Sequence, residues 1–470
     1  MNTIGGTNNA HDPAPRFVDV SKAHPRYFED ASGRTWVPIG CNICFDRLYD
    51  GGAHSHREVR VVFDRWLRAF SANGGNCIRL WAGHPSLEVM PDAPGVFDPE
   101  REETLKGIIA LCEELGIKAK ITLESFRTVN PPGWKGPDGT PTFFNRPLYS
   151  RFAKDMREFL ASEEGYRIYM DKARHLKDMG LGDSPAVYCC EPWNEINCIA
   201  PVSGYAAWSD RALADLKAMF PRQMTVQNLG SYSDKGAYQM YDQLSTVVDN
   251  DFMQMHRYLD PGADLDVCRG PMDVVAASAA HDLLALRPDR PAILAETGAV
   301  LRDHAGPCAF YGQDTEGALL HDELFAPFFS GSAGSGQPWH WDHQYIDGNG
   351  LWWHFRRFAT AIEGLDPVAE AFRPFYTESR RLRMYGLKGR KTAVVWCRDK
   401  HNSWEDEFVH GEPAQTIADE EVPFRDCEME CYLPFEDRHV TRDAPLLPPF
   451  RRSIVVRVPA GATEGVVRPH

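Results

Sequence analysis

The 470-residue sequence lacks several features that define common functional classes. It has no apolar run near 18 residues and no block of five like charges, so no membrane span or highly charged tail is predicted. No GxGxxG or GxxxxGK(S/T) motif follows an early predicted strand, so a nucleotide site has no support. Lys and Arg total 51 against 66 Asp and Glu, and the net charge of −15 argues against nucleic acid or an anionic membrane as the main partner.

The N-terminus lacks the pattern of a secretory signal, and the cysteines lack the spacing of a metal site. Residues 1–15 are polar and have no basic region followed by an apolar stretch, which predicts a flexible segment without a secretory signal. The chain has 12 cysteines but a single CxxC, Cys41–Cys44, and no partner motif at metal spacing. We therefore expect no metal or cofactor, and buried reduced thiols in a cytoplasmic protein. A secreted protein whose signal has been removed is the alternative.

Strand-like and helical patterns alternate from about residue 36 to residue 372. An apolar stripe of helical period covers 59–70, and Asp98-Pro99 and Gly116 mark the start and end of the next helix. Strands are expected at 36–41, 76–81, 118–123, 186–193, 223–228, 252–256, 291–296 and 337–342. Eight such units predict an α/β protein with a closed (β/α)8 TIM barrel, whose active site lies at the C-terminal ends of the strands. A doubly wound open sheet is the alternative.

The pattern changes after residue 375. Segments 391–396, 430–433 and 452–458 are rich in β-formers and are separated by turn residues, with no helical pattern between them. We predict a flexible segment at 1–15, a catalytic barrel with an N-terminal hairpin at 16–375, and a small C-terminal antiparallel β-sandwich at 376–470.

Two glutamates stand at the ends of predicted strands. Glu195 follows the fourth strand and Glu296 closes the seventh. These strands face each other across the mouth of an eight-stranded barrel, so the two carboxyl groups can flank one bond. Glycoside hydrolysis needs such a pair, one to protonate the leaving oxygen and one to attack the anomeric carbon or activate water. Glu191 is an alternative to Glu195, because Pro192 obscures which side chains of this strand point inward.

These motifs resemble glycoside hydrolase clan A, especially family 5 and its mannanase-like relatives. The resemblance rests on Asn194-Glu195 and Glu296, and it extends to segments 28–40, 76–81, 256–258, 331–341 and 394–404. It implies a retaining glycosidase that cleaves β-mannoside or β-glucoside bonds in neutral oligo- or polysaccharides through a covalent glycosyl-enzyme. The alternatives are a non-catalytic carbohydrate-binding barrel protein, a transglycosylase using the same glutamates, or a metal-dependent barrel enzyme, for which the sequence offers no convincing ligand set.

By this resemblance Glu195 is the general acid/base and Glu296 the nucleophile, and the preceding Asn194 is why Glu195 is favoured over Glu191. We expect burial and the negative charge of Glu296 to raise the pKa of Glu195. The remaining residues have these implied roles: Arg79 keeps Glu296 ionised, Asn194 binds the sugar 2-hydroxyl, His256 positions the acid/base, and Tyr258 touches the nucleophile.

Three tryptophans are candidates for stacking on a sugar ring. Trp339 and Trp341 are two residues apart and face the same side of a predicted strand. One of them is expected to line the subsite that holds the sugar to be cleaved, and core packing is the alternative. Trp81 is a further candidate at the rim.

Overall fold

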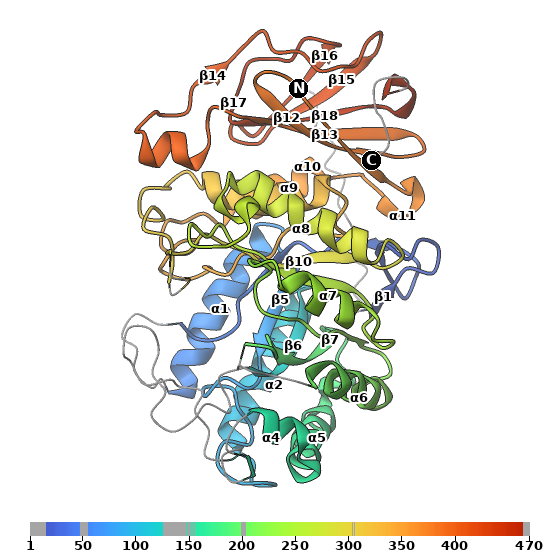
Figure 1. Ribbon diagram of the computed structural model, residues 1–470, viewed down its shortest axis with the longest axis vertical. Coiled ribbons are helices and arrows are strands. Elements are labelled where there is room, and N and C mark those ends of the chain that lie inside the picture. Colours follow the sequence, from blue (N-terminus) through green and yellow to red (C-terminus); the bar gives the residue numbers. More distant parts are fainter. Residues whose placement is uncertain are drawn as a thin grey trace, which may run out of the picture.

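Parallel strands with helices around them fill the lower part of the molecule in Figure 1, and an antiparallel sheet lies above them. The computed structural model describes residues 16–47, 55–125, 148, 152–153, 156–198, 204–302, 304 and 306–463, and the structural statements below refer to these residues. The predicted flexible segment 1–15 lies outside them.

Seven parallel strands form the framework of the larger part. Five of them form one sheet in chain order, and the other two form a second pair. The strands are β4 (Gly40–Cys41), β5 (Cys77–Trp81), β6 (Lys118–Ser125), β7 (Val187–Asn194), β8 (Met224–Thr225), β9 (Met253–His256) and β10 (Ala292–Glu296). They confirm seven of the eight predicted strands. A small antiparallel sheet of β1 (Val18–Val20), β2 (Phe28–Asp30) and β3 (Thr35–Trp36) precedes them.

The eighth predicted strand, 337–342, is irregular. Its only ladder contact among the described residues is an isolated parallel bridge between Thr297 and Pro338, and the missing N–H of proline limits regular pairing there. Backbone hydrogen bonds nevertheless connect this segment on both sides. Trp339 N donates to Thr297 O at 2.8 Å, and Asn42 N donates to Pro338 O at 2.9 Å. A further backbone hydrogen bond links the two parallel sheets between β8 and β9: Asp251 N, just before β9, donates to Thr225 O of β8 at 2.9 Å.

The first two long helices lie where the sequence predicts them. Ser55 and Glu58 form a reciprocal capping box at the start of α1 (His56–Ala72), whose buried stripe includes Val59, Phe63 and Trp66. Asp98 caps α2 (Pro99–Leu115), and Gly116 ends it with a left-handed φ of 71°. The other helices of this part are α4 (Met156–Ala161), α5 (Glu163–Leu176), η1 (Lys177–Leu181), α6 (Tyr205–Met219), α7 (Ala237–Ser245), η2 (Asp266–Arg269), α8 (Met272–Leu286), α9 (Ala318–Phe329), α10 (Trp353–Ala361) and α11 (Pro367–Glu370).

The C-terminal part is built on a six-stranded antiparallel sheet of order β11-β12-β13-β18-β15-β16. Its strands are β11 (Arg373–Glu378), β12 (Leu382–Lys388), β13 (Thr392–Asp399), β15 (Glu428–Leu433), β16 (Arg438–Asp443) and β18 (Ser453–Pro459). A separate pair, β14 (Thr416–Ile417) and β17 (Phe450–Arg451), and the short helices η3 (Glu405–Val409) and η4 (Ala460–Thr463) complete it.

One face of this sheet packs on α9 and joins the two parts of the chain (Figure 1). Trp396 of β13 is fully buried and its ring lies 5.9 Å from that of Phe325 on α9. Arg398 donates two hydrogen bonds to Asp322 across the same contact. The other face buries a second apolar cluster that includes Ile417 of β14.

The described residues bear on two expectations from the sequence, one on membrane-spanning helices and one on the cysteines. None of their helices combines the length and the apolar character that crossing a membrane requires. Their cysteines are free thiols, and most of them, including Cys41 and Cys44, are buried.

Candidate active site

The predicted carboxylates meet at the C-terminal ends of the parallel strands. Glu195 comes directly after β7, and Glu296 and His256 are the last residues of β10 and β9. A bulge between Leu294 and Glu296 shifts the register of these two strands and sets Glu296 opposite His256. Such bulges redirect side chains near active sites.

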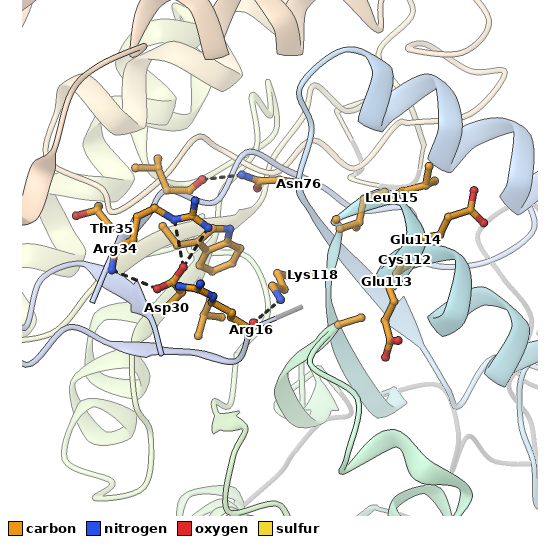
Figure 2. A pocket seen from close by; sticks show the side chains of 16 residues that line it. Arg16, Asp30, Arg34, Thr35, Asn76, Cys112, Glu113, Glu114, Leu115 and Lys118 are labelled. Carbon is orange, nitrogen blue, oxygen red and sulfur yellow. Dashed lines mark hydrogen bonds and ion pairs between the residues drawn. The ribbon is translucent and has the colours of Figure 1, made fainter. Parts of the chain in front are cut away.

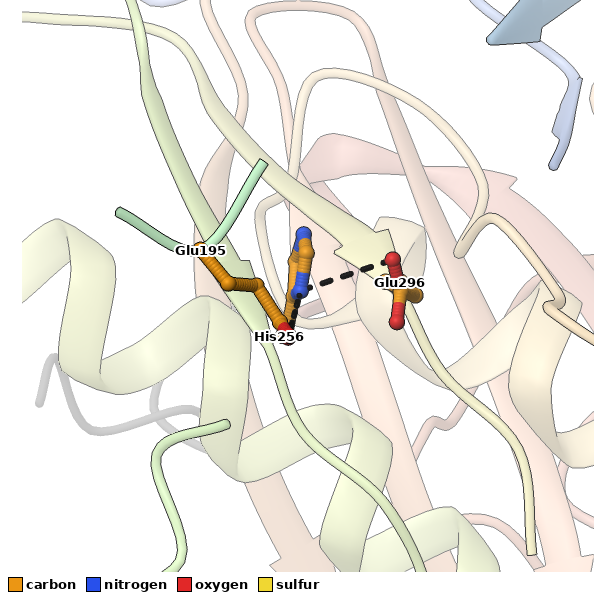
Figure 3. Close-up of side chains that lie close together, drawn as sticks. All are labelled: Glu195, His256 and Glu296. Atoms are coloured by element: carbon orange, nitrogen blue, oxygen red, sulfur yellow. Dashed lines mark hydrogen bonds and ion pairs between the residues drawn. The ribbon is translucent and has the colours of Figure 1, made fainter. Parts of the chain in front are cut away.

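Glu195 and Glu296 lie on either side of the His256 ring (Figure 3). His256 Nδ1 lies 2.7 Å from Glu195 Oε1 and 3.5 Å from Glu296 Oε2. One atom from each of the three residues lies within 4.8 Å of the others, a grouping that could also hold a metal ion. The 2.7 Å hydrogen bond between His256 Nδ1 and Glu195 Oε1 is also an arrangement suited to acid–base chemistry.

Glu296 receives hydrogen bonds on both carboxylate oxygens. Arg79 Nη1 donates to its Oε2 at 2.7 Å, and the Tyr258 hydroxyl donates to its Oε1. Its side chain is 7% exposed. The two donors fix the orientation of the carboxylate and leave a small part of it open to a ligand.

Arg79 is the fully buried cation that joins the acidic groups. Its Nε and Nη2 donate to Glu191 Oε2 at 2.9 and 2.6 Å, and Nη2 also donates to Asn194 Oδ1. Burial acts to lower the pKa of Arg79, but the carboxylates of Glu191 and Glu296 outweigh burial and raise it. The guanidinium therefore stays charged and holds three acceptors in place.

Glu191, the alternative to Glu195, is enclosed within the protein. Its side chain is 0% exposed, and its oxygens accept from these groups in addition to Arg79: Thr122 Oγ1 at 2.6 Å, Asn228 Nδ2 at 2.9 Å and Gln254 Nε2 at 2.6 Å. Burial acts to raise the pKa of Glu191, but Arg79 and Lys120 outweigh it and lower the pKa to about 2. Glu191 therefore anchors Arg79 from below the site.

Replacing Glu191 with glutamine is expected to destabilise the fold by about 3–5 kcal/mol, because it removes the carboxylate paired with the buried Lys120 and one of the two carboxylates paired with the buried Arg79. Urea unfolding of the wild type and of Glu191→Gln measures this difference. Glu103→Gln on α2 is the control, because its side chain is 76% exposed, and it is expected to change the free energy of unfolding by less than about 0.5 kcal/mol. An equally small change in Glu191→Gln would contradict the role of Glu191 as an anchor.

The pH dependence of stability follows from the same residue. Its pKa is about 2 in the folded protein and about 4.3 in an unfolded chain. A lowered pKa stabilises the fold above the unfolded value, and this contribution, about 3 kcal/mol, is lost as the pH falls from about 5 to 2. We expect Glu191→Gln to remove this part of the acid dependence, measured as the free energy of unfolding across that range. An unchanged slope would show that other carboxylates carry it.

Glu195 has a different environment from Glu191. Its side chain is 13% exposed, and its backbone has a φ of 51°, a left-handed conformation that is uncommon outside glycine. Burial acts to raise its pKa, but the hydrogen bond from His256, with smaller electrostatic effects of His304 and Arg79, outweighs burial and lowers it. The predicted raised pKa of Glu195 is therefore wrong for the free protein, because the sequence did not reveal that His256 donates a short hydrogen bond whose effect outweighs burial.

The three candidate tryptophans differ in how much of each side chain is exposed. Trp339 is partly exposed. Its backbone N–H donates to the carbonyl of Thr297, the residue after Glu296, which places Trp339 near the site. Trp81 is 5% exposed, and its ring lies 5.4 Å from that of Trp339. Trp341 is 0% exposed and packs against Trp66 and Phe45. The alternative of core packing therefore fits Trp341, because a side chain with no exposed surface cannot stack on a sugar.

A cavity of about 800 Å³ lies at the opposite ends of the parallel strands (Figure 2). Lys118, the first residue of β6, lines it and donates to Arg16 O at 2.6 Å and Pro185 O at 2.7 Å. Burial lowers the pKa of Lys118 to about 8. Asp30 is held by Arg34 in the same wall. These groups bind one another and are remote from Glu195 and Glu296.

Several functional neighbours were not singled out from the sequence. Asn228, three residues after β8, contacts both Glu191 and the His256 ring. Lys120, Thr122 and Gln254 complete the polar layer beneath Arg79. The alternation of Lys120 and Thr122 with apolar residues in β6 is the sequence signal that could have placed them on one face.

Comparisons with known proteins agree with this fold. No protein-family model and no curated protein sequence matches the chain. A structure described as a glycoside hydrolase matches with a TM-score of 0.59 at 12% identity over 95% of this chain and 97% of that one. A glycoside hydrolase family 5 structure from Bacteroides vulgatus matches at 0.58 and 13%, over 95% and 94%. A family 5 mannosidase from Rhizomucor miehei matches at 0.50 and 14%, over 69% and 86%. The chain therefore shares the fold of family 5 glycoside hydrolase structures, as its sequence predicts.

Proposed function

We propose that this chain is a retaining glycoside hydrolase that cleaves β-mannoside or β-glucoside bonds in neutral oligo- or polysaccharides. The observation that carries the proposal is the close approach of Glu195 and Glu296: a carboxylate oxygen of one lies within 4.8 Å of a carboxylate oxygen of the other. Retaining enzymes hold their two carboxyl groups about 5–5.5 Å apart, whereas inverting enzymes leave about 6.5–9.5 Å for a water molecule. The fold shared with glycoside hydrolases and the net charge of −15, which disfavours anionic polysaccharides, also support it.

The proposal includes the architecture that such a site requires. We infer a closed (β/α)8 barrel at 16–375, in which the irregular segment 337–342 takes the place of the eighth strand and bonds to both Thr297 and Asn42. We infer a C-terminal β-sandwich from residue 376, in which the strand pair β14 and β17 covers the free face of the six-stranded sheet. Glu195 and Glu296 then lie at the mouth of the barrel.

In the first step, a carboxylate oxygen of Glu296 attacks the anomeric carbon while Glu195 gives its proton to the leaving oxygen. The C–O bond to the leaving group breaks, and an ester bond to Glu296 forms. In the second step, Glu195 removes a proton from water as the water attacks the anomeric carbon, which releases the sugar and restores both carboxyl groups. Arg79 and Tyr258 hold the attacking carboxylate in place.

The protonated state of Glu195 is expected in the complex with substrate. Its side chain is 13% exposed, and a bound sugar would displace the remaining water. Desolvation raises the pKa of a carboxyl group, so substrate binding shifts Glu195 toward the acid that the first step needs.

Asn194 and Trp339 are the proposed sugar-binding groups. Arg79 Nη2 holds Asn194 Oδ1, which leaves the amide NH2 to donate to the sugar 2-hydroxyl. Trp339 offers a partly exposed indole beside Thr297 for stacking on the sugar ring, and Trp81 supports it from the side.

Alanine at Trp339 and at Trp341 is expected to have contrasting effects. Trp339→Ala should lower kcat/KM at least about tenfold with a modest loss of stability, because it removes a stacking surface worth about 1.4 kcal/mol. Trp341→Ala should lower the free energy of unfolding by about 3–5 kcal/mol, because it opens a cavity in the core. Kinetics and urea unfolding of both variants distinguish the roles, and reversed results would contradict them.

The function is tested by incubating the purified protein with aryl β-glucoside, β-mannoside, β-galactoside and β-xyloside. We expect hydrolysis of the mannoside or the glucoside, with the β-anomer of the sugar appearing first in a proton NMR time course. The proposed activity would be overturned if the protein hydrolysed neither these aryl glycosides nor oligosaccharides of mannan and cellulose. Initial release of the α-anomer would overturn the retaining mechanism.

A further inference from the structure

Asn228 makes three hydrogen bonds within the site and is completely buried. Its Oδ1 accepts from the backbone N of Glu195 at 2.6 Å, and its Nδ2 lies 2.9 Å from Glu191 Oε1 and 3.0 Å from His256 Nε2. A backbone N–H can only donate, and the ionised Glu191 can only accept. The direction of the Asn228 amide is therefore determined by its partners, with the oxygen toward Glu195 and the NH2 toward Glu191 and His256.

This direction assigns the proton on His256. The NH2 of Asn228 can only donate, so His256 Nε2 must accept and carries no hydrogen. A neutral imidazole then has its hydrogen on Nδ1, which lies 2.7 Å from Glu195 Oε1. The hydrogen-bond network thus assigns His256 as the donor and Glu195 Oε1 as the acceptor.

The same amide holds the backbone of Glu195. A left-handed conformation such as the φ of 51° at Glu195 costs on the order of 1–3 kcal/mol and persists only where the surroundings enforce it. The hydrogen bond from Glu195 N to Asn228 Oδ1 is one such restraint. Asn228 therefore touches Glu195 directly through the backbone and indirectly through His256.

We propose that Asn228 is a positioning residue for the acid/base group: it keeps the hydrogen of His256 on Nδ1 and so reserves Oε2 of Glu195 for the catalytic proton. This inference rests on the proposed function. Oε1 accepts the short hydrogen bond from His256, whereas Oε2 accepts a longer one, 3.7 Å, from Sγ of the exposed Cys198, a weak donor that a substrate oxygen can displace. His256 keeps its own hydrogen throughout the reaction, and the proton travels between Glu195 Oε2 and the glycosidic oxygen or water.

Other charged and titratable groups surround this pair and share its electrostatics. Those that interact with Glu195 or His256 among the described residues include Arg79, Glu191, Cys198, Tyr241, Tyr258, Glu296 and His304. Among the described residues, Asn228 is the group that hydrogen-bonds to His256 Nε2, and it therefore decides the tautomer.

The assignment is tested first without any variant. In the full-length protein labelled with 15N-histidine, the His256 signals, identified by their loss in His256→Gln, are expected to show a protonated Nδ1 and an unprotonated Nε2. The reverse pattern, or protonation of both nitrogens at neutral pH, would overturn the proposal. This result does not depend on activity, so it remains decisive even if no glycoside is hydrolysed, an outcome that would overturn only the proposed function.

The kinetic test uses Asn228→Ala and two substrates of the same sugar. With a poor leaving group, kcat/KM is expected to fall about 10²-fold, because that substrate needs the positioned acid. With a dinitrophenyl leaving group, which departs without protonation, kcat/KM is expected to change less than about threefold. The control is Gln227→Ala, which removes the adjacent buried amide that bonds to Trp193 O and is expected to affect both substrates equally. Equal losses on both substrates in Asn228→Ala would contradict the positioning role.

Discussion

Replacing Glu296 with alanine is expected to lower kcat/KM at least about 10⁴-fold on every substrate, including those with excellent leaving groups. The expectation follows from the geometry, because Arg79 and Tyr258 orient this carboxylate and no other described carboxylate shares its position beside His256 apart from Glu195. Without Glu296 no covalent ester can form. Steady-state hydrolysis of an aryl glycoside measures the loss.

Azide is expected to restore part of the activity lost in Glu296→Ala, and the configuration of the product identifies the missing group. Azide can enter the space left by the side chain and attack from the same face, which gives a glycosyl azide of inverted configuration in one displacement. Asp273→Asn is the matched control, since it removes a buried carboxylate paired with Arg383 of the C-terminal sheet and is expected to keep kcat/KM of the folded protein within about threefold. Residual activity above about one hundredth in Glu296→Ala would contradict the assignment of the nucleophile.

The second large effect is expected for Glu195→Ala, and it depends on the leaving group. With an unactivated glycoside, kcat/KM should fall about 10²–10⁴-fold, because the leaving oxygen is no longer protonated. With a dinitrophenyl glycoside the fall should be small. Measuring both substrates in the same preparation separates loss of the acid from loss of structure.

Azide again provides a distinguishing product. In Glu195→Ala the glycosyl-enzyme still forms on Glu296, so azide attacks that ester and gives a product of retained configuration. Glu191→Gln serves as the comparison, because Glu191 is enclosed by hydrogen bonds and its loss should affect both substrates alike. If Glu191→Gln, rather than Glu195→Ala, showed the dependence on the leaving group, the acid/base assignment would be wrong.

Local patterns in the sequence were sufficient for much of the fold. The apolar stripe of α1 and the Asp98 and Gly116 signals of α2 depend on neighbouring residues in the chain, and the structure confirms them. The parallel strands were also predicted, because each is a short apolar run between helical patterns. The eighth segment differs because Pro338 cannot donate a ladder hydrogen bond.

The site was predictable only in outline. Strand ends located Glu195 and Glu296, but the choice between Glu195 and Glu191 depends on donors from several other strands. Those donors are far away in the sequence, and Pro192 obscures the local alternation. The burial of Trp341 has a similar cause, because Trp66 on α1 covers it.

The resemblance placed His256 beside Glu195, but the direction of the pKa shift of Glu195 was not predictable from the sequence. Its lowered pKa depends on the 2.7 Å contact with His256, and the direction of that contact depends on the amide of Asn228. Asn228 belongs to no motif that the sequence displays. The only local sign is a pair of amides, Gln227 and Asn228, at the end of a predicted strand where polar side chains collect.

The central claim is that Glu296 forms a covalent bond to the sugar, and trapping that intermediate tests it most directly. The protein is incubated with a 2-deoxy-2-fluoro glycoside carrying a dinitrophenyl leaving group, digested, and analysed by tandem mass spectrometry. We predict that one fluorosugar is added per chain, on the peptide that contains Ala292–Glu296 and at Glu296 itself. A label on any other residue, or rapid turnover of hydrolysable glycosides by a protein that never becomes labelled, would contradict the account.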